Sequence, residues 1–253
     1  MMTTPAGQPA TGHSPLHEDL LALLRATRAA ERELFAMLAP AQLDASGAHG
    51  AWSARDVQAH LAAWRAIEAR RLDATARGEG LPADDPAPED PIDESNARLH
   101  AERAGLSWAS VREEADASVE ALIAAIARSS TEALCECDGT AAGIGANAAN
   151  HAIAHLSDIA QQAGAARLFD AFSAEVEAIL RRGHLPVRDS GVMLYNIACH
   201  RALSGELDEA RRLLRAAFAR RHDLVEEAVA DADLAAVRAD LPALAAPAGS
   251  APG

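Results

Sequence analysis

The sequence of 253 residues contains no lysine, so all 23 of its basic residues are arginine. The acidic residues number 37, and the formal net charge is −14. Binding to nucleic acid phosphates requires a basic face, so this charge balance argues against a nucleic acid partner. The absence of lysine fits a codon bias toward arginine and alanine in a GC-rich genome. An arginine-based anion site is the alternative, because the guanidinium group suits anion recognition.

Aromatic residues are also scarce, at 3%, although 49% of the chain is hydrophobic. Alanine and leucine, which favour helices, dominate this apolar content. Sheets favour β-branched and aromatic residues, and no alternating run of such residues predicts a strand. We therefore predict an all-α protein.

No apolar run approaches the length of about 18 residues that suggests a membrane span, and no signal peptide pattern is present. The three cysteines, Cys135, Cys137 and Cys199, are an odd number without disulfide spacing. Cys135 and Cys137 form a Cys-x-Cys pair of the kind found in thiolate metal sites, but the second pair of a zinc knuckle is missing. We expect reduced thiols in a cytoplasmic protein that has no membrane contact.

Helical periodicity and capping residues predict four long helices. They cover residues 15–38, 54–77 and 107–128, and a fourth carries His151 and runs to about residue 168. A short helix is predicted over 92–105. Ser14, Ser53 and Ser107 precede the first three long helices as N-caps, and Pro40 is predicted to end the first. Four such helices predict an up-down four-helix bundle over residues 14–168.

The remaining segments are predicted as follows. Residues 78–91, rich in Pro, Asp and Glu, form a solvated connection, with a mobile flap over the bundle as the alternative. Residues 129–145 form a loop. The ends of the chain, residues 1–13 and 243–253, form a disordered N-terminus and a flexible tail.

Residues 169–242 have a different texture. A helix over residues 170–182 is followed by a helix, a tight turn at Gly205 and a second helix, which together resemble a tetratricopeptide repeat (TPR). Arg201 replaces the usual aromatic residue of that repeat, and His222 replaces the usual proline. Because one repeat cannot bury its own face, this segment must dock on the bundle, pair with another copy, or both.

Two histidines, His151 and His155, lie four residues apart and therefore point the same way on a helix. His60 lies on the buried stripe of the second long helix with Val57 and Leu61. Three imidazoles and an open position suit a catalytic divalent metal. The alternative is three hydrogen-bonded core histidines.

Three further residues are candidates for the pocket around the histidines. Trp52 and Trp64 either line this pocket or serve in packing alone. Asp158, three residues after His155, either orients a ligand or lies on the polar face of its helix.

The stretch Trp52–Trp64 resembles a signature of the DinB-like superfamily, and Asn150–Leu156 is similar to its second part. These are four-helix bundle metalloproteins, among them mycothiol-dependent maleylpyruvate isomerases and bacillithiol S-transferases. Residues 92–130 are also similar to the ClbS/DfsB group. The resemblance implies that His60, His151 and His155 hold a divalent metal, zinc or nickel. It further implies chemistry that involves a low-molecular-weight thiol.

Two functions remain open at this level. The first is a metal- and thiol-dependent transferase or isomerase, or a metal-dependent hydrolase, that acts on a small electrophile. The second is a non-catalytic small-molecule-binding or stress-response module whose TPR-like segment contacts another protein. A third interpretation makes that segment the interface of a homodimer.

Overall fold

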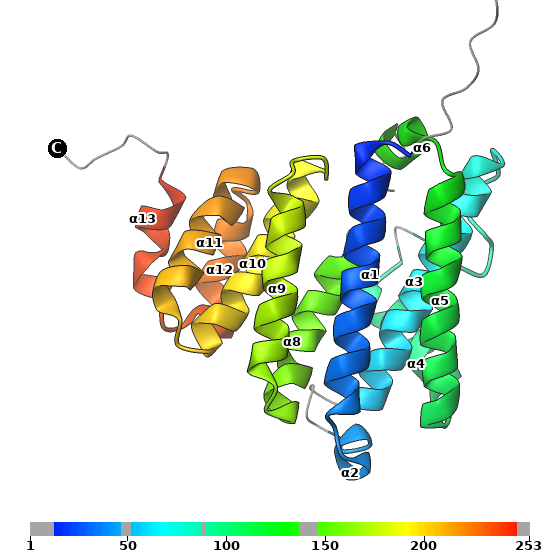
Figure 1. Cartoon of the computed structure of the whole chain (residues 1–253), viewed down its shortest axis with the longest axis horizontal. Helices are drawn as coiled ribbons and strands as arrows, with labels where there is room; N and C mark the ends of the chain where they lie inside the picture. The colour runs from blue at the N-terminus through cyan, green and yellow to red at the C-terminus, as the bar shows by residue number, and fades with distance from the viewer. Residues whose placement is uncertain (1–12, 47–51, 88–89, 137–145, 247–253) are drawn as a thin grey trace, which may run out of the picture.

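The computed structural model describes residues 13–46, 52–87, 90–136 and 146–246 (Figure 1). Within these residues every regular element is a helix and there is no strand. The all-α prediction is therefore confirmed. No helix in the described ranges is long and apolar enough to cross a membrane. The predictions for residues 1–12 and 247–253 lie outside the described residues.

Helix α1 runs from Pro15 to Ala36, and the Ser14 side chain accepts a hydrogen bond from the backbone N–H of His17. The predicted cap and the proline at the first helical position are thus present. Pro40 does not simply end this helix, as predicted, because it is the first residue of a short helix, α2 (Pro40–Leu43). A proline suits that position, since its fixed φ matches a helix and its missing N–H would have had no partner.

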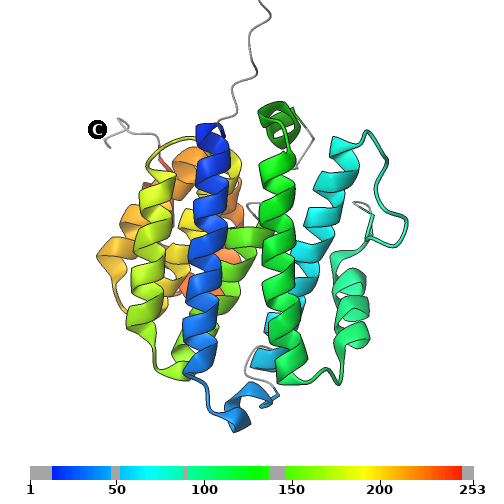
Figure 2. The ribbon, with the colours of Figure 1, turned by 45° about the vertical axis from the view of Figure 1, so that its right-hand side comes forward.

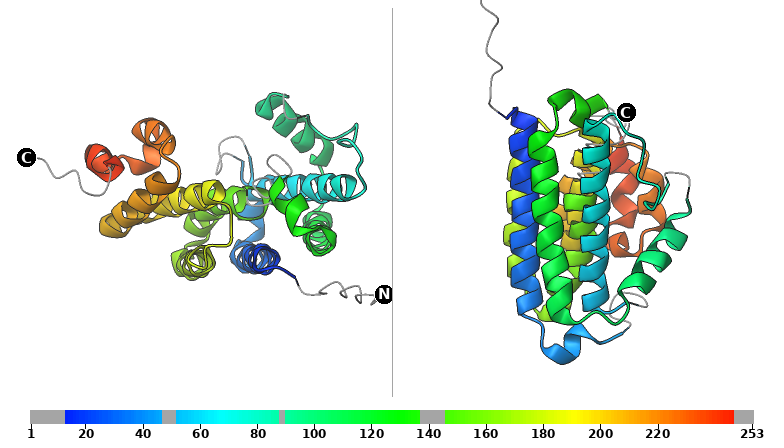
Figure 3. Two further views of the ribbon diagram at one scale, coloured as in Figure 1. Left: turned by 90° about the horizontal axis from the view of Figure 1, so that it is seen from above. Right: turned by 90° about the vertical axis from the view of Figure 1, so that its right-hand side faces the viewer.

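Helix α3 (Ala54–Ala76) begins with a capping box, in which Ser53 and Asp56 bond each other's backbone N–H groups. Helices α4 (Ile92–Arg103) and α5 (Trp108–Arg128) follow, close to their predicted bounds. Helix α4 ends near the start of α3, since its His100 lies 3.5 Å from Asp56. Helix α5 begins there too, because Arg55 of α3 donates to the carbonyl oxygen of Leu106, just before α5. Figure 3 shows α1 and α4 on opposite sides of α3.

Helices α3 and α5 run in the same direction, because Arg128 at the end of α5 pairs with Asp73 near the end of α3. The two helices lie side by side in Figure 2. The prediction of an up-down bundle, in which successive long helices alternate in direction, is therefore wrong. The cause is α4, which carries the chain back along the length of α3 before α5 begins.

The connection before α4 is not wholly solvated. The Asp85 side chain is only 1% exposed and pairs with Arg70. Arg71 also donates to the carbonyl oxygen of Pro86. These contacts tie the connection to α3. Residues 88–89 lie outside the described residues.

The predicted loop over residues 129–145 is wrong in its first part, since Thr131–Glu136 forms α6. Leu134 of α6 is fully buried in the core, and this burial explains why the segment becomes helical. Residues 137–145 lie outside the described residues. The prediction for Cys135 and Cys137 also cannot be compared with the structure, because no side-chain position is described for either residue.

The fourth long helix is shorter than predicted. A π-helical turn, η1 (Ala146–Asn150), leads into α8 (His151–Ala163), and a new helix, α9 (Ala166–Leu180), follows. Gly164 ends α8 in the left-handed conformation, with φ of +63°, which costs glycine nothing. The helix therefore stops before residue 168, and the proposed boundary at 168 falls within α9.

The C-terminal segment contains the predicted helix, glycine turn and helix, as α10 (Val187–Leu203), Gly205 and α11 (Leu207–Arg220). Four short helices complete it: α12 (Leu224–Ala230), η2 (Ala232–Leu234), η3 (Arg238–Asp240) and α13 (Leu241–Ala245). Leu244 of α13 is buried, so the predicted flexible tail is wrong for residues 243–245.

Most buried apolar side chains form one core that reaches from α1 to α13. A second, smaller cluster between α3 and α4 consists of Ala63, Trp64, Ile67 and Leu99. Helix α10 contacts α8 and η1, and the Asn196 side chain donates to the carbonyl oxygen of Asn150. The C-terminal segment is thus docked on the helix that carries His151 and His155, as Figure 1 also shows.

Candidate metal centre

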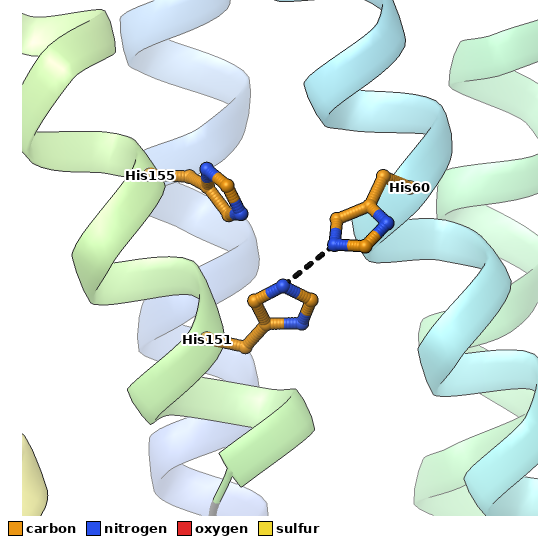
Figure 4. Close-up of side chains that lie close together, drawn as sticks. All are labelled: His60, His151 and His155. Atoms are coloured by element: carbon orange, nitrogen blue, oxygen red, sulfur yellow. Dashed lines mark hydrogen bonds between the residues drawn. The ribbon is translucent and has the colours of Figure 1, made fainter. Parts of the chain in front are cut away.

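Three histidines from two helices converge in the core. His60 comes from α3, while His151 and His155 come from α8 (Figure 4). The three rings each offer a nitrogen atom, and these atoms all lie within 4.8 Å of one another. The Nε2 atoms of His60 and His151 are 2.7 Å apart. The structure therefore brings together, across a separation of 91 residues, the three side chains that were predicted as metal ligands.

Local structure explains each position. The capping box at Ser53 sets the start of α3, and His60 then falls on its buried stripe, 4% exposed. His151 and His155 are one helical turn apart on α8. The π-helical turn before them widens the backbone at its entry, a feature often found at functional sites.

Aromatic side chains flank His60. The ring centroids of Trp52 and Trp64 lie 4.6 Å and 6.5 Å from that of His60. The indole N–H of Trp64 donates to Asn96 of α4, and Trp52 stacks on His100 of the same helix. Both tryptophans thus lie beside the histidines, and α4 holds them in place.

Asp158 does not join the three histidines. It is exposed on α8, and its negative charge helps to raise the pKa of Asp233. The exposed position agrees with the polar-face interpretation of Asp158, and its role in orienting a ligand stays a prediction.

Burial keeps His60 and His151 in their neutral form. Burial, with smaller effects from the nearby His155, His100 and Arg103, lowers the pKa of His60 to about 3. Burial likewise holds the pKa of His151 well below its ordinary value, with smaller effects from His60, His155 and Arg65. Neutral imidazole is the form that binds a metal ion.

The donor set fits a divalent metal. Two nitrogens bound to tetrahedral zinc are about 3.3 Å apart, given zinc–nitrogen bonds of about 2.0–2.1 Å. The 2.7 Å between the His60 and His151 Nε2 atoms is therefore short by only a few tenths of an ångström. At most one proton can occupy this contact, whereas a metal ion would satisfy both lone pairs.

Sequence reasoning missed a buried ion-pair network behind His151. Arg65 of α3 is fully buried and pairs with Glu31 of α1, which is also fully buried. Glu31 additionally accepts hydrogen bonds from Arg28 and Gln58. The sequence does contain a signal for this network. Glu31 lies between Leu24 and Leu34 on the buried face of α1, and a buried charge needs an oppositely charged partner.

Cys199 belongs to a second group, in which its Sγ and the carboxylates of Asp231 and Asp233 lie within 4.8 Å of one another. Internal hydrogen bonds account for this group: Tyr195 donates to Asp231 at 2.6 Å, and the Cys199 thiol donates to the same carboxylate. Burial and the two aspartates raise the pKa of Cys199 above its ordinary value. Cys199 is free and therefore agrees with the prediction of a reduced thiol.

The low pKa of His60 predicts acid sensitivity in the metal-free protein. In the unfolded chain His60 takes up a proton near its ordinary pKa of 6.5, whereas in the folded chain its pKa is about 3. The contribution of His60 to the free energy of unfolding is therefore fully present above about pH 6.5. It is lost as the pH drops toward 3, by up to about 1.4 kcal/mol per pH unit.

Urea unfolding of the metal-free protein at about pH 7 and about pH 5 measures this effect. From about pH 7 to about pH 5, the free energy of unfolding of His60→Gln is expected to fall by about 2 kcal/mol less than that of the native chain. Equal losses in the two proteins would show that His60 does not titrate in this way.

Comparison with known proteins adds one finding. A family model described as the DinB superfamily matches residues 23–159, which is more than half of the chain. The match includes α3 and the first part of α8, and so all three histidines. No curated protein and no solved structure matches the chain significantly.

Proposed function

The chain belongs to the DinB superfamily, and from this and the geometry of its three histidines we propose that it is a metal- and thiol-dependent enzyme. In this proposal it acts on a small electrophile, as an S-transferase or isomerase, or as a metal-dependent hydrolase. The observation that carries the proposal is the convergence of three imidazoles, two of them strongly held neutral, in the core of the fold.

The chain's own residues have distinct roles in this proposal. His60, His151 and His155 hold the metal, for which zinc and nickel are the proposed identities because both accept imidazole ligands. A divalent metal, when bound, lowers the pKa of a coordinated thiol or water. Trp52 and Trp64 shield the His60 side from water. The positive charge of Arg65, close enough to His151 to lower its pKa, favours an anion such as a thiolate nearby.

The reaction is tested with full-length protein purified without a histidine tag and loaded with zinc or nickel. Low-molecular-weight thiols are mixed with monobromobimane, whose bromide is displaced by the thiol sulfur, and the fluorescent product is followed. We expect metal-loaded protein to accelerate at least one of these reactions about a hundredfold or more over metal-free protein. The acceleration should be absent in His155→Ala. No acceleration with any thiol would favour the non-catalytic module.

The non-catalytic alternative has its own support. The α10–α11 pair consists of two helices joined at Gly205, which supports the TPR-like interpretation. Val187 and Leu203 at the two ends of α10 are 62% and 46% exposed. Exposed apolar side chains suit a protein contact. We propose that residues 169–242 form a TPR-like unit, docked on a DinB-like unit over 14–168, that contacts a second copy or another cytoplasmic protein. Membership of the ClbS/DfsB group stays a prediction.

A further inference from the structure

The buried ion-pair network between α1, α3 and α5 carries an excess positive charge. Glu31 pairs with both Arg28 and Arg65, and Asp116 of α5 pairs with both Arg28 and Arg32. Three guanidinium groups thus share two carboxylates. In a chain with a net charge of −14, this is a local reversal of sign.

Part of this network is shielded from water, whereas Arg32 and Asp116 at its outer end are 61% and 41% exposed. Arg28 is only 7% exposed and Arg65 is fully buried, and burial lowers the pKa of both guanidinium groups. A buried positive charge that shares its carboxylates with other arginines is only partly compensated, so a further anion beside Arg28 would be favourable. The network therefore has the electrostatic character of an anion site.

A cavity of about 410 Å³ opens beside this network, between α1 and α5. Its size falls within the range of small-molecule sites, about 300–1,000 Å³. Arg28, Arg32 and Asp116 line one end. Because α1 and α5 run antiparallel, Phe35 and Trp108 line the other end, with their ring centroids 5.6 Å apart.

A further arginine, Arg112 of α5, also lines this cavity. It is exposed, and no hydrogen bond or ion pair joins its side chain to another residue within the described ranges. Its guanidinium group is therefore available to a ligand. Three carboxylates also line the cavity, those of Glu31, Glu113 and Asp116. Glu31 and Asp116 pair with the arginines of the network, so the cavity combines an ion-paired end, the exposed Arg112 beside Glu113, and an apolar aromatic end.

We propose that this cavity is a second ligand site, which binds a small organic anion that carries an aromatic ring. Guanidinium groups bind carboxylates through two parallel hydrogen bonds, and Arg112 provides such a pair of donors at the rim. Arg32, whose Nε and Nη2 atoms donate to Asp116, adds its remaining Nη1 donor. The ring of the ligand stacks at the Phe35 and Trp108 end. The site is separate from the three histidines, since none of them lines the cavity.

The test is calorimetric titration of the full-length, metal-loaded protein with benzoate. Benzamidine, which has the same ring and a positive charge, and benzyl alcohol, which is neutral, serve as matched probes. We expect saturable binding of benzoate at millimolar concentration, at least about tenfold tighter than either matched probe. Absence of benzoate binding, or equal binding of the three probes, would overturn the proposal.

Variants locate the binding. Arg112→Ala and Arg32→Ala, both at exposed positions, are each expected to weaken benzoate binding about tenfold. Arg215→Ala, an exposed arginine on α11, is the charge-matched control and should leave the affinity unchanged. Binding that neither cavity variant weakens would also overturn the proposal.

His155→Ala separates this site from the metal centre. It should retain benzoate binding whether or not thiol-dependent activity is ever found, because the cavity does not use the histidines. Loss of benzoate binding in His155→Ala would instead assign the anion to the metal and contradict the second site.

Discussion

His155→Ala is expected to remove nearly all of the divalent metal from the protein. The native chain should bind about one equivalent, held by three imidazoles. Losing a partner that only orients a ligand weakens metal binding by about 10–100-fold, so losing a ligand itself should cost at least about 100-fold. Inductively coupled plasma mass spectrometry of protein purified without a histidine tag measures the metal content.

Variants of the other two histidines, and of one histidine outside the site, test the same prediction. His60→Ala and His151→Ala should lose the metal as His155→Ala does, since the three nitrogen atoms form one group. His222→Ala, at an exposed histidine after α11, should retain it. Normal metal content in all three site variants would show that these histidines are hydrogen-bonded core residues. Absence of metal from the native chain after addition of zinc or nickel would lead to the same conclusion.

Glu31→Gln is expected to destabilise the fold by about 3–5 kcal/mol, the usual cost of removing one partner from a buried ion pair. Glu31 is fully buried and is the carboxylate that Arg28 and Arg65 share. In Glu31→Gln the guanidinium groups of Arg28 and Arg65 remain buried next to each other, and no carboxylate balances the charge of Arg65. Urea unfolding of the native and variant proteins at neutral pH measures the difference in the free energy of unfolding.

Glu33→Gln is the matched control, because Glu33 is exposed on the same helix and its replacement should change stability by no more than about 0.5 kcal/mol. A double variant that replaces both Glu31 and Arg65 with methionine should recover part of the loss, since an apolar pair needs no charge compensation. A loss below about 1 kcal/mol in Glu31→Gln would mean that water reaches the network and solvates the two arginines.

Most helix starts could be predicted from the sequence because their signals are local. Ser14, Ser53 and Ser107 each cap the backbone N–H of a residue only three positions away. Helix ends were less predictable. Gly164 ends α8 early, and α6 forms where a loop was predicted because Leu134 is buried in the core.

The sequence by itself determined the helical class of the protein and the shared face of His151 and His155, since both follow from helical propensity and a period of 3.6 residues. It also placed His60 on a buried stripe. Tertiary structure alone decided that α3 and α5 run parallel, that His60 meets His151 at 2.7 Å, and that Glu31 meets Arg65. These contacts join residues far apart in the chain, and they depend on which faces pack together across the core, a choice that no local pattern encodes.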